Sequence, residues 1–291
     1  MSTPLLSVVI PTWNRAHIVG EAIESALTQR RGQVEVIVVD DGSTDDTADV
    51  LTRSFGSHVR LLLLPRRGGA GAARNAGVHL ASGELLAFLD SDDLWLPGKL
   101  DAEMNVLERF PDADAVVSDS LSFLEGQADD RSRFEANGLL AATNRQARPM
   151  SELQWLWTSF HNAMATCSIT LRRSAAQRFG GKLFAEDLVY CEDWEFELRV
   201  YYFCRVVVLP EVLARVRRFD DGSRPGRGLP GKPLTREHEI DLLRDRLKVM
   251  ERCDWLSGLD ADLAVELERC RVDTALQLAR LTNVERKSVA S

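Results

Sequence analysis

The stretch VEVIVVDDGSTDDTADVLTRSF occupies residues 34–55 and shows the unit from which the first part of the chain is built. Its first seven residues are mostly apolar and β-branched, which is typical of a strand buried on both faces. The polar turn that follows leads into about a dozen residues with a helical pattern. The same unit recurs up to residue 120, and it predicts an α/β fold with a mostly parallel central sheet flanked by helices. The expected strands are 6–11, 34–40, 58–64, 84–90 and 114–120, and the expected helices are 17–29, 44–55, 70–81 and 97–110.

The pattern weakens after residue 120. Residues 122–150 are mixed and polar, which predicts a long surface excursion. A helix is expected at 152–160, a strand at 166–173, a helix at 191–203 that begins with a carboxylate pair, and two strands within 205–219. A Gly- and Pro-rich hinge at 220–233 precedes a charged helical tail at 236–283, in which Leu242, Leu243, Leu247 and Met250 have helical spacing.

Composition bounds the class of protein. The chain has 291 residues and a formal net charge of −8, which argues against nucleic acid as a partner. Five cysteines without a CxxC pair indicate free thiols and a reducing compartment, so a cytoplasmic location is expected. The longest apolar runs are strand-sized, so neither a transmembrane helix nor a signal peptide is expected. Peripheral association with a membrane through the helical tail is left open by the sequence.

Two strand ends are unusually polar. VVDDGSTDD follows the second strand and FLDSDD follows the fourth, and ligands of such sheets bind beyond the carboxyl ends of the strands. We therefore expect both segments to open onto one crevice. Part of the first segment has a structural explanation, because Ser43 or Thr44 can cap the helix that follows.

The spacing of Asp90 and Asp92 places both side chains on one side of an extended backbone. Mg²⁺ and Mn²⁺ prefer oxygen ligands and are commonly held by one or two carboxylates together with substrate phosphates. The pair therefore suits a cation bound to a nucleoside diphosphate. A structural alternative is that Asp92 or Asp93 caps the helix expected at 97–110.

Five landmarks in order give the chain a specific resemblance. They are SVVIPTWNR, VIVVDDGSTDDT, GGAGAARNAG at 68–77, FLDSDD at 88–93 and EDWEFELRV at 192–200. Over residues 6–220 the chain resembles the glycosyltransferases of family 2, inverting enzymes of the GT-A fold that transfer a sugar from a nucleotide donor. The resemblance implies a nucleotide-sugar-binding half at 1–120, an acceptor-binding half at 121–220, and a hinge and helical tail at 221–291.

The resemblance also implies roles for individual residues. Pro11 and Thr12 are expected to hold the nucleobase and ribose, and Asp41 to bond the base. Asp92 is expected to be the main ligand of Mg²⁺ or Mn²⁺, with Asp90 near the metal and the ribose. The remaining residues expected at the donor site are Asn14, Arg15, Arg74 and Asn75.

The carboxylate pair at the start of the helix at 191–203 matches the position of the family's base. Asp193 is expected to remove the proton of the acceptor hydroxyl, with Glu192 as the alternative. Acids in the first turn of a helix are also favoured by the helix dipole, which is the structural explanation. Trp194 shares a face with Leu198 and Tyr201, which favours core packing over stacking on an acceptor sugar.

The chain departs from the family at one place. Many members carry Arg-x-His after the last strand, whereas RVRRF has Phe219 at that position, which puts a third protein ligand of the metal in doubt. Several arginines lie near this position. Two interpretations are equally favoured: the arginines bind diphosphate, or they belong to a solvated basic loop. These residues are Arg217, Arg218, Arg224 and Arg227. Trp155 and Trp157 are two residues apart, so one of them is free to meet a ligand or the tail.

Two other classes compete with this interpretation. GAGAAR at 69–74 resembles a dinucleotide fingerprint, which would indicate an NAD(P)-dependent oxidoreductase, but Arg74 replaces its third glycine. A GT-A-like module that binds a sugar nucleotide without turnover is the second alternative. The resemblance favours UDP-sugar as the donor, because Asp41 suits the edge of uracil. The acceptor, whether glycan, lipid-linked or small molecule, is open, as is a homo-oligomer formed through the C-terminal helices.

Overall fold

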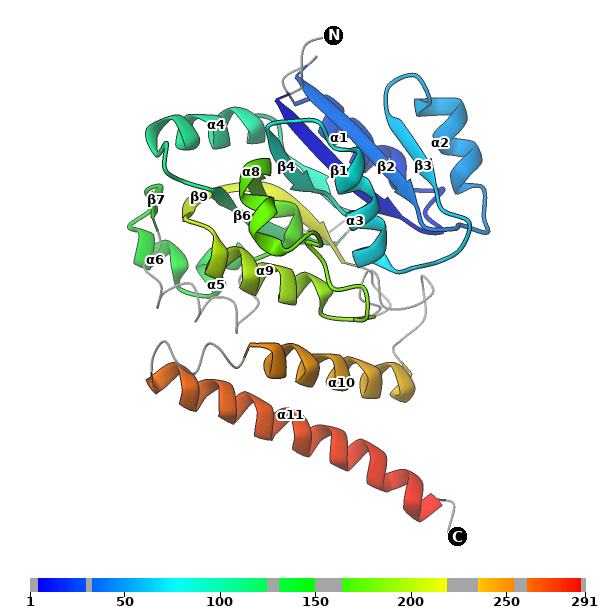
Figure 1. Ribbon diagram of the computed structural model, residues 1–291, viewed down its shortest axis with the longest axis vertical. Coiled ribbons are helices and arrows are strands. Elements are labelled where there is room, and N and C mark those ends of the chain that lie inside the picture. The colour runs from blue at the N-terminus through cyan, green and yellow to red at the C-terminus, as the bar shows by residue number, and fades with distance from the viewer. Residues whose placement is uncertain are drawn as a thin grey trace.

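The computed structural model describes residues 5–29, 33–124, 131–149, 164–218, 235–253 and 261–288, and within the last helix it describes the side chains of 264–282. A mixed sheet forms the centre of the molecule, with helices on both of its faces and two further helices stacked beneath it (Figure 1). The predicted α/β class with a mostly parallel sheet is thereby confirmed. The division into two functional halves stays a prediction, because one continuous sheet spans both.

Nine strands make up the described sheet, in the order β3-β2-β1-β4-β8-β6-β9-β5, with β7 paired to β9. Strands β1 to β4 run parallel, and β8 is antiparallel to both β4 and β6. The strands are β1 (Leu6–Thr12), β2 (Val34–Asp40), β3 (Arg60–Leu63), β4 (Leu85–Phe88), β5 (Leu94–Trp95), β6 (Ala115–Phe123), β7 (Arg148–Pro149), β8 (Ile169–Arg172) and β9 (Val206–Arg217).

Helices connect these strands and cover the sheet. The described helices are α1 (Val19–Leu27), α2 (Thr47–Phe55), α3 (Ala70–Leu80), α4 (Lys99–Arg109), α5 (Arg133–Ala136), α6 (Leu139–Thr143), α8 (Arg173–Ala176), α9 (Glu192–Phe203), α10 (Arg236–Arg252) and α11 (Ala261–Ser288). Helices α1 and α4 lie on one face of the sheet, and α3, α8 and α9 lie on the other.

Alternation along the strands explains why both faces are covered. In β1, Val8 and Ile10 point into the core beneath α1 and α4, whereas Val9 between them points into the core beneath α3 and α9. Successive side chains of a strand point to opposite faces, so a run of consecutive apolar residues needs a layer on each side of the strand. The continuous apolar runs in the sequence therefore dictate three layers.

Several local expectations are corrected by the structure. Residues 206–217 form the single strand β9, whose register against β6 shifts near Asp119, instead of two strands. Neither Ser43 nor Thr44 caps α2, which begins after Asp46, and α4 begins after Gly98 without a side-chain cap. The helical tail is divided into α10 and α11.

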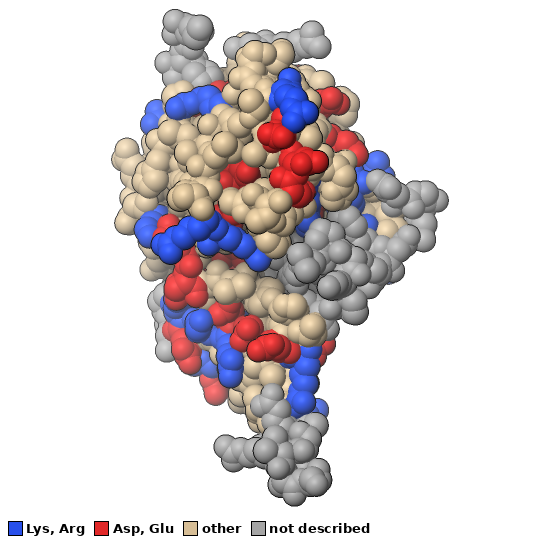
Figure 2. Space-filling view, turned by 90° about the vertical axis from the view of Figure 1, so that its right-hand side faces the viewer, with Lys and Arg blue, Asp and Glu red and all other residues tan. Residues whose placement is uncertain are grey.

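The tail packs against the sheet domain through α10. Val249 and Met250 are fully buried, and Leu243 is 8% exposed. Helix α11 packs on the far side of α10, as Figure 1 shows, and exposes Val265, Val272 and Leu276. Acidic and basic side chains are intermixed over these helices on the face shown in Figure 2. A homo-oligomer formed through the tail stays a prediction.

Some predictions fall on residues that the structure does not describe. These are the helix expected at 152–160 with Trp155 and Trp157, the hinge at 220–233, and Phe219, Arg224 and Arg227. None of the five cysteines, all of which are described, forms a disulfide, as expected. Within the described ranges, every helix is too short or too polar to cross a membrane.

Gly77 lets α3 approach the sheet closely. A Cβ at this position would overlap Val9 Cγ1 and would lie 3.2 Å from Val39 Cγ2, which is closer than most real Cβ contacts. Gly77→Ala is therefore expected to lower the free energy of unfolding by about 1–3 kcal/mol, because both valines belong to rigid buried strands. Urea denaturation measures this loss.

Gly20→Ala is the matched control, because Gly20 is also helical and its added Cβ would lie 3.4 Å from Phe55 Cζ, an ordinary contact. We expect this variant to gain up to about 1 kcal/mol from helix propensity. Equal stabilities of the two variants would contradict the close packing of α3 on the sheet.

Candidate active site

A cavity of about 540 Å³ opens at the carboxyl ends of the parallel strands. Nearly all the residues predicted for the site line this one cavity, although they come from segments as distant in the sequence as Pro11 and Asp193. They are Pro11, Thr12, Arg15, Asp41, Arg74, Asp90, Asp92, Glu192 and Asp193. The structure thus brings together the strand-end acids and the start of α9.

The end of β1 forms one part of the wall. Thr12 is 3% exposed, and its hydroxyl has no hydrogen-bond partner among the described residues, so it is a candidate to bond a ligand. The adjacent Trp13 also lines the cavity, and the Arg67 guanidinium lies 3.7 Å from the centroid of its ring. These two residues were missed, although Trp13 directly follows the predicted strand end.

Asn14 does not line the cavity, which corrects its expected place at the donor site. It has a positive φ of 52°, and its side-chain oxygen accepts a hydrogen bond from the Thr44 N–H at 2.8 Å. Its own N–H donates to Ser43 Oγ at 2.9 Å. Asn14 therefore joins the loop after β1 to the turn after β2.

Asp41 lies at the end of β2 and is 3% exposed. Its two carboxylate oxygens accept hydrogen bonds from the N–H groups of Gly68 and Gly69, at 2.7 and 2.8 Å. Burial raises the pKa of Asp41 above its ordinary value, although these two N–H groups act in the opposite direction. Each oxygen keeps a second lone pair, so Asp41 fixes the glycine loop and can still accept a bond from a ligand.

Asp90 and Asp92 follow β4 and both line the cavity. The Asp92 side chain is 5% exposed, and Arg15 Nη2 lies 3.5 Å from its Oδ2. Burial and the nearby Asp90 raise the pKa of Asp92 to about 6, while Arg15 opposes this. Because the negative charges of Asp90 and Asp92 repel each other, the pair favours the binding of a cation.

Asp93 and Arg217 serve the fold instead of the cavity, which corrects one expectation for Arg217. The Arg217 N–H donates to Asp93 Oδ1 at 3.0 Å, and its guanidinium donates to the Asp92 carbonyl at 3.0 Å and to Glu21 at 2.6 Å. Arg217 is 4% exposed, so it anchors the end of β9 instead of binding diphosphate. Arg218 is exposed and lies outside the cavity wall.

Arg74 connects the two groups of acids. Its Nη2 donates to Asp90 Oδ1 at 2.6 Å and its Nη1 donates to Glu192 Oε1 at 3.0 Å, while its side chain is 3% exposed. The carboxylates of Asp90 and Glu192 raise the pKa of Arg74, although burial acts against them. A permanently charged guanidinium therefore holds the end of β4 and the start of α9 in fixed relation.

Asn75, the neighbour of Arg74, does not line the cavity as was expected. Its side-chain oxygen accepts from the N–H groups of Leu183 and Phe184, and its nitrogen donates to the Phe184 carbonyl at 2.8 Å. It also donates to Glu186 at 3.0 Å. Asn75 thus holds the segment that leads to α9.

The first turn of α9 places Glu192 and Asp193 on the cavity wall. Cys191, just before them, has a positive φ of 62°, which few residues other than glycine adopt and which sets the direction of the turn. Burial and the nearby Asp193 raise the pKa of Glu192 to about 7, with Arg74 opposing. Asp193 is exposed to the cavity, and its Oδ1 accepts from the Trp194 N–H at 2.8 Å.

Trp194 packs against the core that contains Leu198 and Tyr201, in agreement with the packing interpretation. The Arg246 guanidinium of α10 lies 5.8 Å from the centroid of its ring. Helix α10 also reaches the cavity itself through His238 and Asp241. No sequence signal pointed to these two residues, because they lie far along the chain in a tail with an ordinary helical pattern.

The donor set fits a divalent cation held jointly with a ligand. Among the residues that line the cavity are seven carboxylates and three arginines. No group of three or more His, Cys, Asp or Glu side chains in the described ranges is arranged to hold a metal alone. Asp90 and Asp92 supply hard oxygen ligands, so Mg²⁺ or Mn²⁺ would complete its coordination with phosphate and water oxygens.

Comparison with known proteins identifies the family. The model of the family "Glycosyl transferase family 2" matches residues 7–180, which is more than half of the chain. The chain therefore belongs to glycosyl transferase family 2.

A glycosyltransferase of another organism has a similar sequence. An uncharacterised glycosyltransferase of Rickettsia prowazekii is 27% identical over 215 residues, which cover 74% of this chain and 64% of the relative. The chain thus spans about two thirds of the length of that protein.

Two solved structures share the fold. S. aureus TarS in complex with UDP-GlcNAc has a TM-score of 0.64 at 21% identity, over 96% of this chain and 72% of TarS. The mannosyltransferase PcManGT from Pyrobaculum calidifontis, in complex with GDP-Man and Mn²⁺, has a TM-score of 0.59 at 18% identity, over 100% of this chain and 81% of PcManGT. The predicted GT-A fold is confirmed by this likeness.

The oxidoreductase alternative is wrong on two grounds. The chain belongs to a transferase family. In addition, Arg74 takes the place of the third glycine of the dinucleotide fingerprint, and its buried side chain bonds Asp90 and Glu192.

Proposed function

We propose that the protein is a metal-dependent, inverting glycosyltransferase that moves a sugar from a nucleoside-diphosphate donor to an acceptor hydroxyl. In this proposal Pro11, Thr12 and Asp41 bind the nucleoside. The diphosphate lies near Asp90 and Asp92 with Mg²⁺ or Mn²⁺. The sugar lies between that point and Asp193.

One observation carries the proposal: the strand-end acids and Asp193 line the same cavity. A wall with an excess of carboxylates repels an anionic diphosphate unless a cation is bound with it. The acids at the strand ends and the acid at the start of α9 therefore have different uses. The first group suits a cation and its diphosphate, whereas Asp193 belongs to another element, α9.

The chemistry assigns a task to each group. Asp193 accepts the proton of the acceptor hydroxyl as the oxygen attacks the anomeric carbon on the face opposite the diphosphate, which inverts that carbon. Arg74 and Arg15 fix the carboxylates around them, so that little reorganisation is needed as charge moves to the diphosphate. A bound divalent cation stabilises the negative charge that develops on the leaving diphosphate.

UDP-sugar is the favoured donor in this proposal. The choice of uracil as the nucleobase rests on the family resemblance and on Asp41. Each oxygen of Asp41 retains a lone pair that can accept a hydrogen bond from the N–H of uracil. TarS binds UDP-GlcNAc, and PcManGT binds GDP-Man with Mn²⁺. Members of the fold thus take either base, and GDP is the informative competitor. We propose a cytoplasmic site of action, and the acceptor stays open among glycans, lipid-linked sugars and small molecules.

Thermal unfolding in the presence of nucleotide and metal tests the donor site. UDP with Mn²⁺ at a hundred times the dissociation constant is expected to stabilise the protein by about 2.7 kcal/mol, which corresponds to roughly 5 °C in the unfolding temperature. UDP alone should give a much smaller shift, because the acids of the wall then oppose the diphosphate.

The Asp92→Asn variant is the control for the metal. It removes one carboxylate while keeping the side-chain shape, and we expect the difference between UDP alone and UDP with Mn²⁺ to shrink. A shift with UDP that is the same with and without Mn²⁺ would contradict metal dependence. No shift with UDP or GDP under any condition would contradict the proposed function.

A further inference from the structure

Helix α10 forms a wall of the cavity although it lies outside the part of the chain that the family model matches. His238 and Asp241 line the cavity, and Asp245 follows one turn later on the same side of the helix. The family model ends at residue 180, whereas α10 begins at Arg236. Helix α9, with Glu192 and Asp193, also lies beyond this match, so the cavity is completed by two helices from outside the matched residues.

Asp245 ties α10 to the segment that carries the proposed base. It is 4% exposed, and its Oδ2 accepts hydrogen bonds from the N–H groups of Val189 and Tyr190, at 2.8 and 3.0 Å. Both of these residues line the cavity, and they lie directly before Cys191 and Glu192. The position of α10 is thus fixed relative to the start of α9.

Two further contacts strengthen this attachment. Arg252 pairs with Asp187 on the same segment, and the Arg246 guanidinium lies over the Trp194 ring. Asp241 lies one helical turn from Asp245, or about 6 Å along the axis. It therefore faces the part of the cavity next to residues 188–190, on the side of α9.

The chemistry of Asp241 and His238 fits sugar hydroxyls. Asp241 pairs with Arg244 at 3.1 Å, and a carboxylate is repelled by diphosphate but accepts hydrogen bonds from hydroxyl groups. The Nδ1 atom of His238 lies 3.2 Å from the Thr235 N–H and accepts from it, which assigns the ring proton to Nε2. One residue can thus accept from a hydroxyl while the other donates to one.

We infer that α10 selects the sugar of the bound nucleotide sugar, with Asp241 and His238 as its specificity-determining residues. The inference rests on the proposed function, since it needs a nucleotide sugar in the cavity. It goes further in assigning sugar recognition to the C-terminal tail. In this assignment the residues at the strand ends bind the nucleotide, and α10 binds the hydroxyl groups of the sugar that is transferred.

Calorimetric titration tests the inference with the full chain and Mn²⁺. The probes are UDP-glucose, UDP-N-acetylglucosamine, GDP-mannose, and the free nucleotides UDP and GDP. For the sugar nucleotide that the wild type binds best, Asp241→Ala is expected to raise the dissociation constant about tenfold, because a hydrogen bond to a charged group is lost. The affinity for the corresponding free nucleotide should change less than about twofold, and His238→Ala should act in the same direction.

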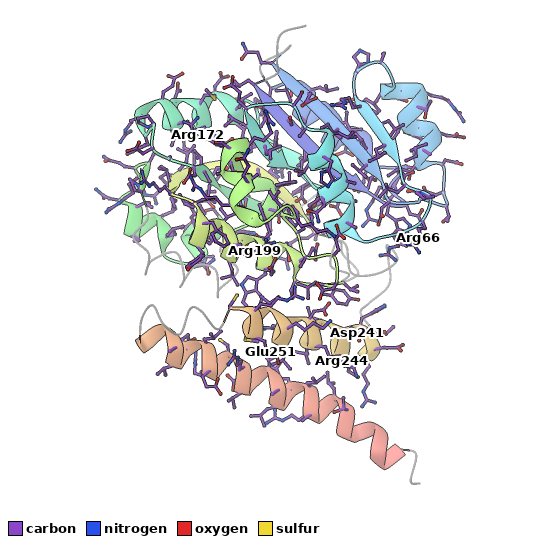
Figure 3. The ribbon with its side chains drawn as sticks, viewed as in Figure 1. Arg66, Arg172, Arg199, Asp241, Arg244 and Glu251 are labelled. Carbon is purple, nitrogen blue, oxygen red and sulfur yellow. The ribbon has the colours of Figure 1, made fainter. Side chains whose placement is uncertain are left out.

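Glu251→Ala is the matched control. It removes one carboxylate from the same helix, but Glu251 is exposed, does not line the cavity, and lies near the opposite end of α10 from Asp241 (Figure 3). We expect it to leave every affinity unchanged. Circular dichroism of the three variants shows that each of them is folded.

The outcomes separate this inference from the proposed function. Unchanged sugar-nucleotide binding in Asp241→Ala, or an equal loss for sugar nucleotide and free nucleotide, would overturn the role of α10 and leave the proposed function standing. A wild type that binds UDP or GDP as tightly as every sugar nucleotide would also overturn it. A wild type that binds none of the probes would overturn the proposed function, and the inference with it.

Discussion

Replacing Asp193 by asparagine is expected to lower the rate of sugar transfer by about 10²- to 10⁴-fold, the usual contribution of a general base. The amide cannot accept the proton of the acceptor hydroxyl, yet it has nearly the same shape as the carboxylate. The affinity for the donor should stay within about twofold, since Asp193 lies on α9 and not at the strand ends. Steady-state rates of nucleotide release with acceptor present, together with titration of UDP and Mn²⁺, measure both effects.

Glu192→Gln is the comparison that distinguishes the two acids of this turn. Glu192 is paired with Arg74 at 3.0 Å, whereas Asp193 is open to the cavity, so the rate should fall less in Glu192→Gln. A larger loss in Glu192→Gln than in Asp193→Asn would exchange their roles. Equal nucleotide release by the wild type and Asp193→Asn would favour a module that binds sugar nucleotide without turnover.

Replacing Arg74 by methionine is expected to destabilise the protein by about 2–4 kcal/mol. Removing one partner of a buried ion pair typically costs about 3–5 kcal/mol, and the expected cost is somewhat smaller here because the Asp90 side chain is 38% exposed. In this variant the Glu192 carboxylate, next to Asp193, loses the guanidinium that pairs with it. Urea denaturation at pH 7 measures the loss.

The pH dependence of this loss identifies its electrostatic origin. The pKa of Glu192 is about 7 in the folded protein, above its ordinary value, so stability falls as the pH rises from the unfolded pKa to the folded one. Arg74 holds this pKa down, and without Arg74 the fall continues above pH 7. The gap between Arg74→Met and the wild type should therefore widen from pH 6 to pH 8.

Arg53→Met is the control for this substitution. Arg53 pairs with Asp49 at 2.8 Å on the surface of α2, where both side chains are more than half exposed. Exposed pairs of this spacing contribute about 0.3–0.5 kcal/mol, so its loss should be small. A gap between Arg74→Met and the wild type that does not change with pH would indicate lost packing instead of an unpaired carboxylate.

The strands and most helices could be predicted because their patterns are local. The runs of consecutive apolar residues within β1 and β2 specify burial on both faces, whatever the remote parts of the chain do. The order of parallel strands then places their carboxyl ends at one edge of the sheet. For this reason the sequence alone predicts that Asp41 and Asp92 lie in one crevice.

Errors arose where a local preference was overridden by distant contacts. Ser43 is a good helix cap, but its hydroxyl bonds Asp40 and the N–H of Asn14, so α2 begins later. The tandem arginines at the end of β9 resemble a phosphate site, yet Arg217 is directed by Glu21 and the Asp92 carbonyl into the interior. Neither partner can be read from the residues that surround Arg217 in the sequence.

The sequence by itself determined the α/β class, the apolar strands, and the acids that follow them, because these depend on the periodicity of neighbouring residues. Tertiary structure alone decided that Arg74 joins Asp90 to Glu192, that Asn14 bonds the turn after β2, and that α10 lines the cavity. These contacts join residues from 16 to more than 100 positions apart. They depend on how the layers pack on the sheet, and no local pattern of side chains encodes that packing.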